Sequence, residues 1–107
     1  MSKVDVIYIF WSCRDKIEAK KIVGKLLEER IVACASMIPE VESIYRWEEV
    51  IEESFEVKVI LKTISKHFEK VCAVIQSMCS YKVPEIVQID VVRGNPSYLS
   101  WIKTETD

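Results

Sequence analysis

Two helix-like segments, each enclosed between strand-like segments, limit this chain to very few folds. The first repeats apolar residues at helical spacing as far as Arg30, and Asp15 with Glu18 three residues later is typical of a helix start. The second begins at Ser65 and is broken before Pro84. Strand patterns flank both segments, so the two kinds of structure alternate along the chain.

Four segments have the composition or the alternation of β-strands. Residues 4–11 are almost continuously apolar, which is typical of a central strand covered on both faces. Residues 31–47 contain Pro39, which predicts an edge position or a bulge. Residues 55–62 alternate between apolar and polar side chains, so one face of that strand is expected to be buried. Residues 85–92 provide the fourth strand.

The predicted order is strand, helix, strand, strand, helix, strand, followed by a short C-terminal helix. Asn95 and Pro96 predict the start of that last helix, as its cap and its first residue. The order is that of the split βαβ, or ferredoxin-like, α+β sandwich, in which two helices cover one antiparallel sheet. Because the chain has 107 residues, 50% of them hydrophobic, we expect a single domain spanning 1–107.

The hairpin predicted over residues 31–63 is longer than a small four-stranded sheet needs. A two-stranded ribbon alone in water is only marginally stable, so something is expected to pair with its outer part. If the hairpin of one subunit pairs with the sheet of the next, the contact repeats until a ring closes. A homotrimer satisfies this arrangement, although the spacing alone does not fix the number of subunits.

Charge and targeting features narrow the choice of partners. The net charge is -2, so no broad positive field attracts nucleic acid. The apolar run at 4–11 contains Asp5, is too short to cross a membrane and has no basic leader, so we expect a cytoplasmic protein without a membrane partner. In that reducing compartment the cysteines are expected to be free thiols. They are Cys13, Cys34, Cys72 and Cys79.

The thiols and the single histidine are the candidate ligands for a soft metal ion, because thiolate and imidazole bind copper and zinc. Their spacing is poor, since the sequence has no C-x-x-C motif and no histidine pair. Thiols packed as small hydrophobic groups are the simpler interpretation. His67, near a helix start, is expected on the surface rather than at a metal.

Polar and aromatic side chains near the predicted strand ends form a second candidate group. Such residues can line a cleft between subunits, but ordinary cross-strand packing with surface ion pairs explains them as well. The group consists of Tyr45, Trp47, Glu48, Lys62, Tyr81 and Glu85.

The signatures of several common functions are missing from the sequence. It has no glycine-rich motif that would cradle a phosphate and no nucleophile evident beside the histidine. It also lacks the aromatic and basic signature of an RNA-recognition sheet. A protein that is not an enzyme is therefore expected.

Ordered motifs run along nearly the whole chain. They are Ala33-Cys34-Ala35, Ile38-Pro39, Ser43-Ile44-Tyr45-Arg46-Trp47-Glu48, Lys62-Thr63, Tyr81-x-Val83-Pro84-Glu85 and Gly94-Asn95-Pro96-x-Tyr98-Leu99-x-Trp101-Ile102. Together these motifs resemble the CutA family of divalent-cation tolerance proteins. This resemblance implies a ferredoxin-like trimer with extended intersubunit sheets, similar in architecture to PII signalling proteins, and a link to tolerance of copper or other divalent ions.

The resemblance also suggests where ligands would bind. Metal-binding proposals in the family involve cysteines and a histidine, and Cys79 stands at the position of that histidine, so Cys34 and Cys79 are the expected contacts for copper or another divalent ion. Glu49 stands where the hairpin turn usually has glycine. The residues expected to line an intersubunit cleft are Trp47, Lys62, Tyr81 and Glu85.

Three functions stay open at this stage. The first is a trimeric metal-responsive protein that acts in divalent-cation tolerance by binding metal ions. The second is a PII-like sensor whose clefts between subunits bind a small anionic metabolite, with Lys62 as the feature that motivates it. The third is a structural trimer without any ligand.

Overall fold

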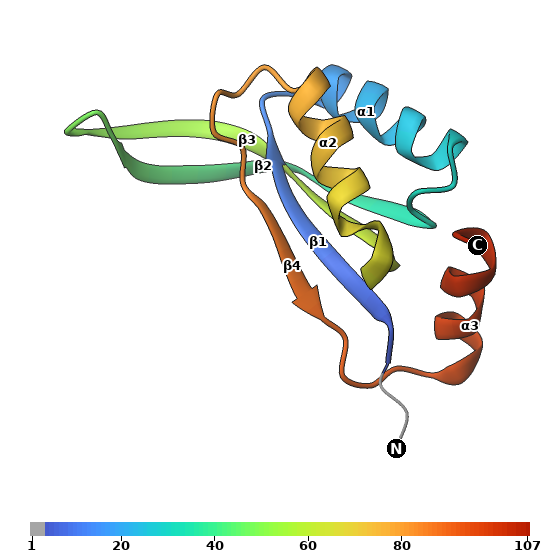
Figure 1. Ribbon diagram of the computed structural model, residues 1–107. Coiled ribbons are helices and arrows are strands. Elements are labelled where there is room, and N and C mark those ends of the chain that lie inside the picture. Colours follow the sequence, from blue (N-terminus) through green and yellow to red (C-terminus); the bar gives the residue numbers. More distant parts are fainter. Residues whose placement is uncertain (1–3) are drawn as a thin grey trace.

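The computed structural model describes residues 4–107 and confirms the ferredoxin-like α+β fold (Figure 1). One antiparallel sheet has the strand order β2-β3-β1-β4, so β1 lies in the middle as predicted. A 3-10 turn at Ser65–His67 precedes the second helix. The elements are β1 (Val6–Cys13), α1 (Lys16–Glu28), β2 (Cys34–Trp47), β3 (Val50–Ile64), α2 (Phe68–Met78), β4 (Ile86–Asp90) and α3 (Pro96–Glu105).

The first helix begins where the sequence predicts it. Asp15 has an extended backbone, and its side chain accepts a hydrogen bond of 2.8 Å from the backbone N–H of Glu18. At the other end Arg30 adopts a left-handed φ of 58°. This reversal lets the N–H of Ile31 donate to the carbonyl of Leu26 at 2.9 Å, which closes the helix and directs the chain toward β2.

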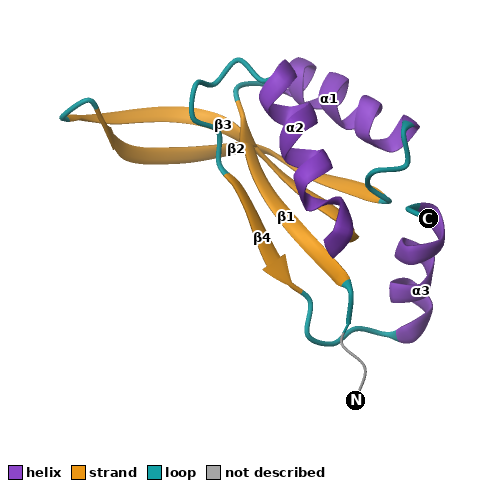
Figure 2. Cartoon of the chain, in the orientation of Figure 1, coloured by secondary structure: helices purple, strands orange, loops and turns teal. Residues whose placement is uncertain are grey.

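The hydrophobic core lies between one face of the sheet and the helices α1 and α2 (Figure 2). Alternate residues of the two central strands point into it, in agreement with the predicted period of two. The opposite face is not covered by these helices, and Tyr8 and Phe10 of β1 are only half-buried there. The core residues of β1 and β3 include Ile7, Ile9, Trp11, Val57, Val59 and Leu61, each at most 3% exposed.

The two central strands differ in length, and this difference creates a projecting hairpin. Residues 57–64 of β3 pair with β1, whereas residues 50–56 pair with β2 alone. The register between β2 and β3 shifts between Ile38 and Val41, beside the proline that predicted a bulge on an edge strand. Residues 41–56, called the outer hairpin from here on, extend beyond the part of the sheet that contains β1 and β4 (Figure 1).

His67 was predicted on the surface, and that prediction is wrong. The side chain is 8% exposed, and its Nε2 lies 2.8 Å from the carbonyl oxygen of Thr106. This contact joins the start of α2 to the end of α3, two segments 39 residues apart in sequence.

No helix within residues 4–107 is long and apolar enough to cross a membrane.

Candidate functional site

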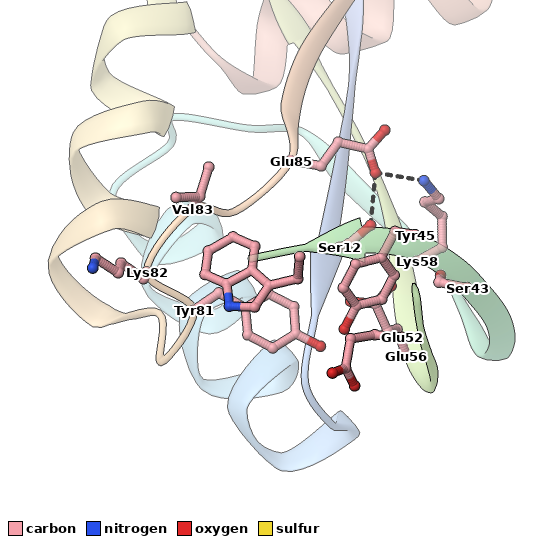
Figure 3. A pocket seen from close by; sticks show the side chains of 11 residues that line it. Ser12, Ser43, Tyr45, Glu52, Glu56, Lys58, Tyr81, Lys82, Val83 and Glu85 are labelled. Atoms are coloured by element: carbon pink, nitrogen blue, oxygen red, sulfur yellow. Dashed lines mark hydrogen bonds and ion pairs between the residues drawn. The ribbon is translucent and has the colours of Figure 1, made fainter. Parts of the chain in front are cut away.

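A cavity of about 600 Å³ lies between the outer hairpin and the segment that follows α2 (Figure 3). Three of the four side chains predicted to line a cleft, Trp47, Tyr81 and Glu85, do line this cavity. They are brought together within one chain, since Trp47 lies on the outer hairpin and Tyr81 and Glu85 lie on the segment after α2. Tyr45, Glu52 and Glu56 of the outer hairpin also line the cavity.

Glu85 is held at the inner end of the cavity by two hydrogen bonds. Its Oε1 accepts from Ser12 Oγ and from Lys58 Nζ, each at 2.6 Å (Figure 3). Burial opposes the charge of this carboxylate, but the hydrogen bonds from Lys58 and Ser12 outweigh it and lower the pKa of Glu85. Sequence reasoning missed Ser12 and Lys58. Their direct pairing across β1 and β3 was the available signal, since it places both side chains on one face.

Tyr81 is half-buried in the wall of the same cavity. Burial and the influence of Glu56 raise the pKa of its hydroxyl, so the group stays protonated. The hydroxyl of Tyr45 lies 3.4 Å from Ser54 Oγ on the neighbouring strand. The cavity therefore combines aromatic hydroxyls with carboxylates.

Lys62, the fourth predicted cleft residue, lies elsewhere. Its Nζ donates to Ser36 Oγ at 3.1 Å and lies 5.6 and 5.9 Å from the ring centroids of Tyr8 and Tyr98. Burial opposes its charge, but the interactions with Tyr98 and Cys34 outweigh burial and raise the pKa of Lys62. Cys34 is its direct partner across β2 and β3. These two predicted site residues thus share a place on the sheet, outside the cavity.

Cys79 lies close to a thiol that sequence reasoning did not select. Cys13 is fully buried and donates from Sγ to Glu18 Oε2 at 3.3 Å. The same oxygen accepts from the backbone N–H and the hydroxyl of Ser80, at 3.3 and 3.1 Å. Burial, Glu18 and the nearby Cys79 raise the pKa of Cys13 to about 12. Glu18 therefore ties the end of β1 to the segment that carries Cys79.

The two cysteines predicted to contact metal are not neighbours within one subunit. Cys34 pairs with Lys62, whereas Cys13, beside Cys79, pairs with Val57, five residues earlier on β3. Five residues of strand span roughly 17 Å. Within residues 4–107, no three side chains of His, Cys, Asp or Glu converge in a way that could hold a metal ion.

The sheet order, the two covering helices and the long hairpin define a ferredoxin-like subunit with a projecting β-ribbon. The chain belongs to the CutA1 divalent ion tolerance family, whose model matches residues 7–105. A search of known proteins finds the mouse "Protein CutA", 36% identical over 98 residues, or 92% of this chain. This chain spans only 55% of the length of that mouse protein.

Two further relatives support the same family. The divalent-cation tolerance protein CutA of Escherichia coli O45:K1 is 33% identical over 101 residues, covering 94% of this chain and 90% of that protein. The solved structure of the periplasmic divalent cation tolerance protein CutA from Archaeoglobus fulgidus superposes with a TM-score of 0.92 at 31% identity. That superposition covers 95% of this chain and 99% of the other.

Proposed function

We propose that this chain acts in divalent-cation tolerance as a homotrimer that binds copper or another soft metal ion and catalyses no reaction. Membership of the CutA1 family supports the tolerance role. The proximity of Cys79 to Cys13 is the single structural observation that supports a soft-metal contact, because thiolates select ions such as Cu(I). Metal uptake would have to displace the proton that Cys13 retains.

Uncovered apolar surface supports the assembly. The sheet face opposite the helices carries Val87 and Ile89 of β4, each 45% exposed, beside the half-buried Phe10. Ile44 and Phe55 of the outer hairpin are 64% and 62% exposed. Large apolar patches on a soluble subunit mark surfaces that another chain covers. Both edge strands, β2 and β4, are free to pair within the described residues.

Native mass spectrometry of the reduced, metal-free protein tests the assembly and the metal together. We expect a trimer that takes up a fixed, small number of ions when a slight excess of Cu(I) is added under anaerobic conditions. A monomer would contradict the assembly. A trimer without specific uptake would contradict the metal role.

Substitution of single thiols locates the metal contact. We expect Cys79→Ser to lower the affinity for Cu(I) about tenfold or more, as loss of one soft ligand should. Cys72→Ser is the matched control, because Cys72 is another half-buried thiol of the α2 region. Cys34→Ser tests the second predicted contact separately. If Cys79→Ser leaves the stoichiometry and the affinity unchanged, Cys79 has no metal role.

A second candidate function, a PII-like sensor of a small molecule, is favoured by the cavity that Trp47, Tyr81 and Glu85 line. Thermal-shift screening of nucleotides, organic acids and amines tests it. We expect at least one class to raise the melting temperature of the wild-type protein and to lose this effect in Trp47→Leu. An anion effect abolished by Lys62→Ala would instead locate binding at the Lys62 site.

We also propose a cytoplasmic location, supported by four free cysteines, Cys13, Cys34, Cys72 and Cys79. The relative from Archaeoglobus fulgidus is named periplasmic, so the compartment needs its own test. Fractionation of cells expressing the tagged protein should recover it with cytoplasmic markers. Recovery with periplasmic markers would overturn the proposal.

A further inference from the structure

We propose that the cavity beside the outer hairpin binds a small organic ammonium cation. The proposal rests on the second candidate function, that of a small-molecule sensor, and names the class of molecule that the cavity would take. Three features of the cavity carry it: its aromatic rings, its unpaired charge and the spacing of its carboxylates.

Three aromatic rings line the cavity from two different segments. Tyr45 and Trp47 are two residues apart on β2 and share one face of the strand, while Tyr81 comes from the segment after α2. Tyr45 and Trp47 are 42% and 41% exposed, so their rings are open to a ligand. The electron-rich face of such a ring attracts a cation placed within about 6 Å of its centre. Rings on two walls can contact one ligand from both sides.

After the one ion pair in the cavity is set aside, the remaining charge of its lining is negative. Lys58 neutralises Glu85 through the contact of 2.6 Å. Lys82 also lines the cavity and forms no ion pair within the described residues, but its side chain points away from the other labelled side chains (Figure 3). Glu52 and Glu56 form no ion pair with any residue of the described part of the chain. The unpaired lining groups are therefore this one ammonium and two carboxylates. An anion would therefore be repelled from this wall, and a cation attracted to it.

The spacing of the carboxylates favours an organic cation over a metal ion. Glu52 and Glu56 are four residues apart on β3, which separates their backbones by roughly 13 Å. Ca²⁺ and Mg²⁺ need several oxygen ligands within about 2.0–2.6 Å. An ammonium group with alkyl substituents spreads its charge over a larger surface, and its apolar groups pack against the rings.

The hydroxyl of Tyr81 connects the aromatic wall to the acidic wall. Burial and the influence of Glu56 raise the pKa of this hydroxyl, so the ring stays neutral and keeps its electron-rich face. This arrangement offers a cation both a ring face and a carboxylate at one place.

A titration with tetramethylammonium chloride tests the proposal on the assembled protein. Two-dimensional NMR spectra recorded at constant ionic strength monitor each step of the titration. We expect saturable shifts of the amides of Tyr45, Trp47 and Tyr81. The double variant Glu52→Gln with Glu56→Gln should weaken binding about tenfold. Glu53→Gln is the matched control, because Glu53 lies on β3 between them and alternates to the opposite face, and it should change the affinity less than about twofold.

Three comparison ligands separate the outcomes. Tert-butanol has a similar size without the charge, and equal binding of this alcohol would overturn the role of charge. Mg²⁺ saturating the same amides more tightly than tetramethylammonium would overturn the choice of an organic ion. Citrate binding in the cavity, without ammonium binding, would overturn this inference and leave the sensor function standing. If none of the ligands binds, this inference fails, and the thermal-shift screen decides the sensor function separately.

Discussion

The inner and outer halves of the central hairpin are formed by the same two strands, β2 and β3, but they differ in burial and in pairing with β1. In its inner half, β3 alternates buried Val57, Val59 and Leu61 with partly exposed residues, and β1 pairs with it along its whole length. In the outer hairpin, residues 41–56, no side chain is fully buried. The inner half contributes side chains to the hydrophobic core, whereas the outer half leaves its side chains accessible to solvent.

Two tryptophans show this contrast within one residue type. Trp11 of β1 is completely buried, although its Nε1–H has no hydrogen-bond partner within the described structure. Trp47, at the end of β2, is 41% exposed and lines the cavity. Tryptophan therefore fills the core in one region and faces a candidate binding site in the other. Substitutions in each region should separate stability from binding.

The largest expected effect is that of Trp11→Ala. Removing a fully buried indole should cost about 3–5 kcal/mol of the free energy of unfolding, because a cavity remains in the core. Trp47→Ala should cost less than about 1 kcal/mol, since that side chain is already half-exposed. Urea unfolding monitored by circular dichroism measures both free energies of unfolding. Equal losses would mean that the outer hairpin is as much a part of the core as β1.

A smaller effect is expected from Thr63→Val at the inner end of β3. The buried Thr63 hydroxyl donates to the carbonyl of Ile31 at 2.6 Å, and valine leaves that acceptor unpaired. The expected loss is about 1–2 kcal/mol. Thr104→Val is the control, because that side chain is exposed and should change stability by less than about 0.5 kcal/mol. A similar small change in both variants would show that the hydroxyl bond contributes nothing.

The inner half was also the more predictable from sequence. The strands, both covering helices, the Asp15 cap and the edge bulge beside Pro39 follow from periodicity and from local backbone chemistry. The burial of His67 did not follow, because its partner, the carbonyl of Thr106, is 39 residues away and leaves no local pattern. The sequence also predicted that β1 is covered on both faces. The two helices cover only one face and leave Tyr8 on the other face half-buried.

The candidate sites were predictable only in part. Trp47, Tyr81 and Glu85, which were predicted together, line one cavity of the chain, whereas Lys62, predicted with them, lies on β3 outside the outer hairpin. That these residues line a cleft between subunits stays a prediction. The proximity of Cys13 to the Cys79 segment depends on how the end of β1 meets the end of α2, which neither residue spacing nor composition predicts. Contacts of this kind arise from tertiary packing and become visible only in three dimensions.

The ion pair at the junction of the two regions should give a modest pH dependence. The pKa of Glu85 is lowered in the folded state, so its contribution is present above its ordinary value of 4.5 and is lost as the pH falls through the lowered value. Glu85 and Lys58 are 39% and 27% exposed, and solvent screening limits the effect to about 1 kcal/mol or less.

Urea unfolding between about pH 3 and about pH 7, a range that brackets the ordinary pKa of a glutamate, measures this dependence. Glu85→Gln should flatten the acid limb of the stability curve relative to the wild-type protein. Glu53→Gln is the control, because Glu53 has no ion pair among the described residues, and it should preserve the curve. If both variants keep the wild-type slope, the lowered pKa of Glu85 is not coupled to folding.

The smallest expected effect, and the only gain, lies at the tip of the outer hairpin. Glu48 and Glu49 adopt left-handed φ angles of 47° and 72°, a conformation that favours glycine. Glu49→Gly should relieve this strain and, after the loss of chain entropy, stabilise the protein by about 0.5 kcal/mol. Glu49→Ala removes the same charge without relieving φ and should give no gain. Equal gains in stability in both variants would mean that charge repulsion between the two glutamates, rather than backbone strain, destabilises the tip of the hairpin.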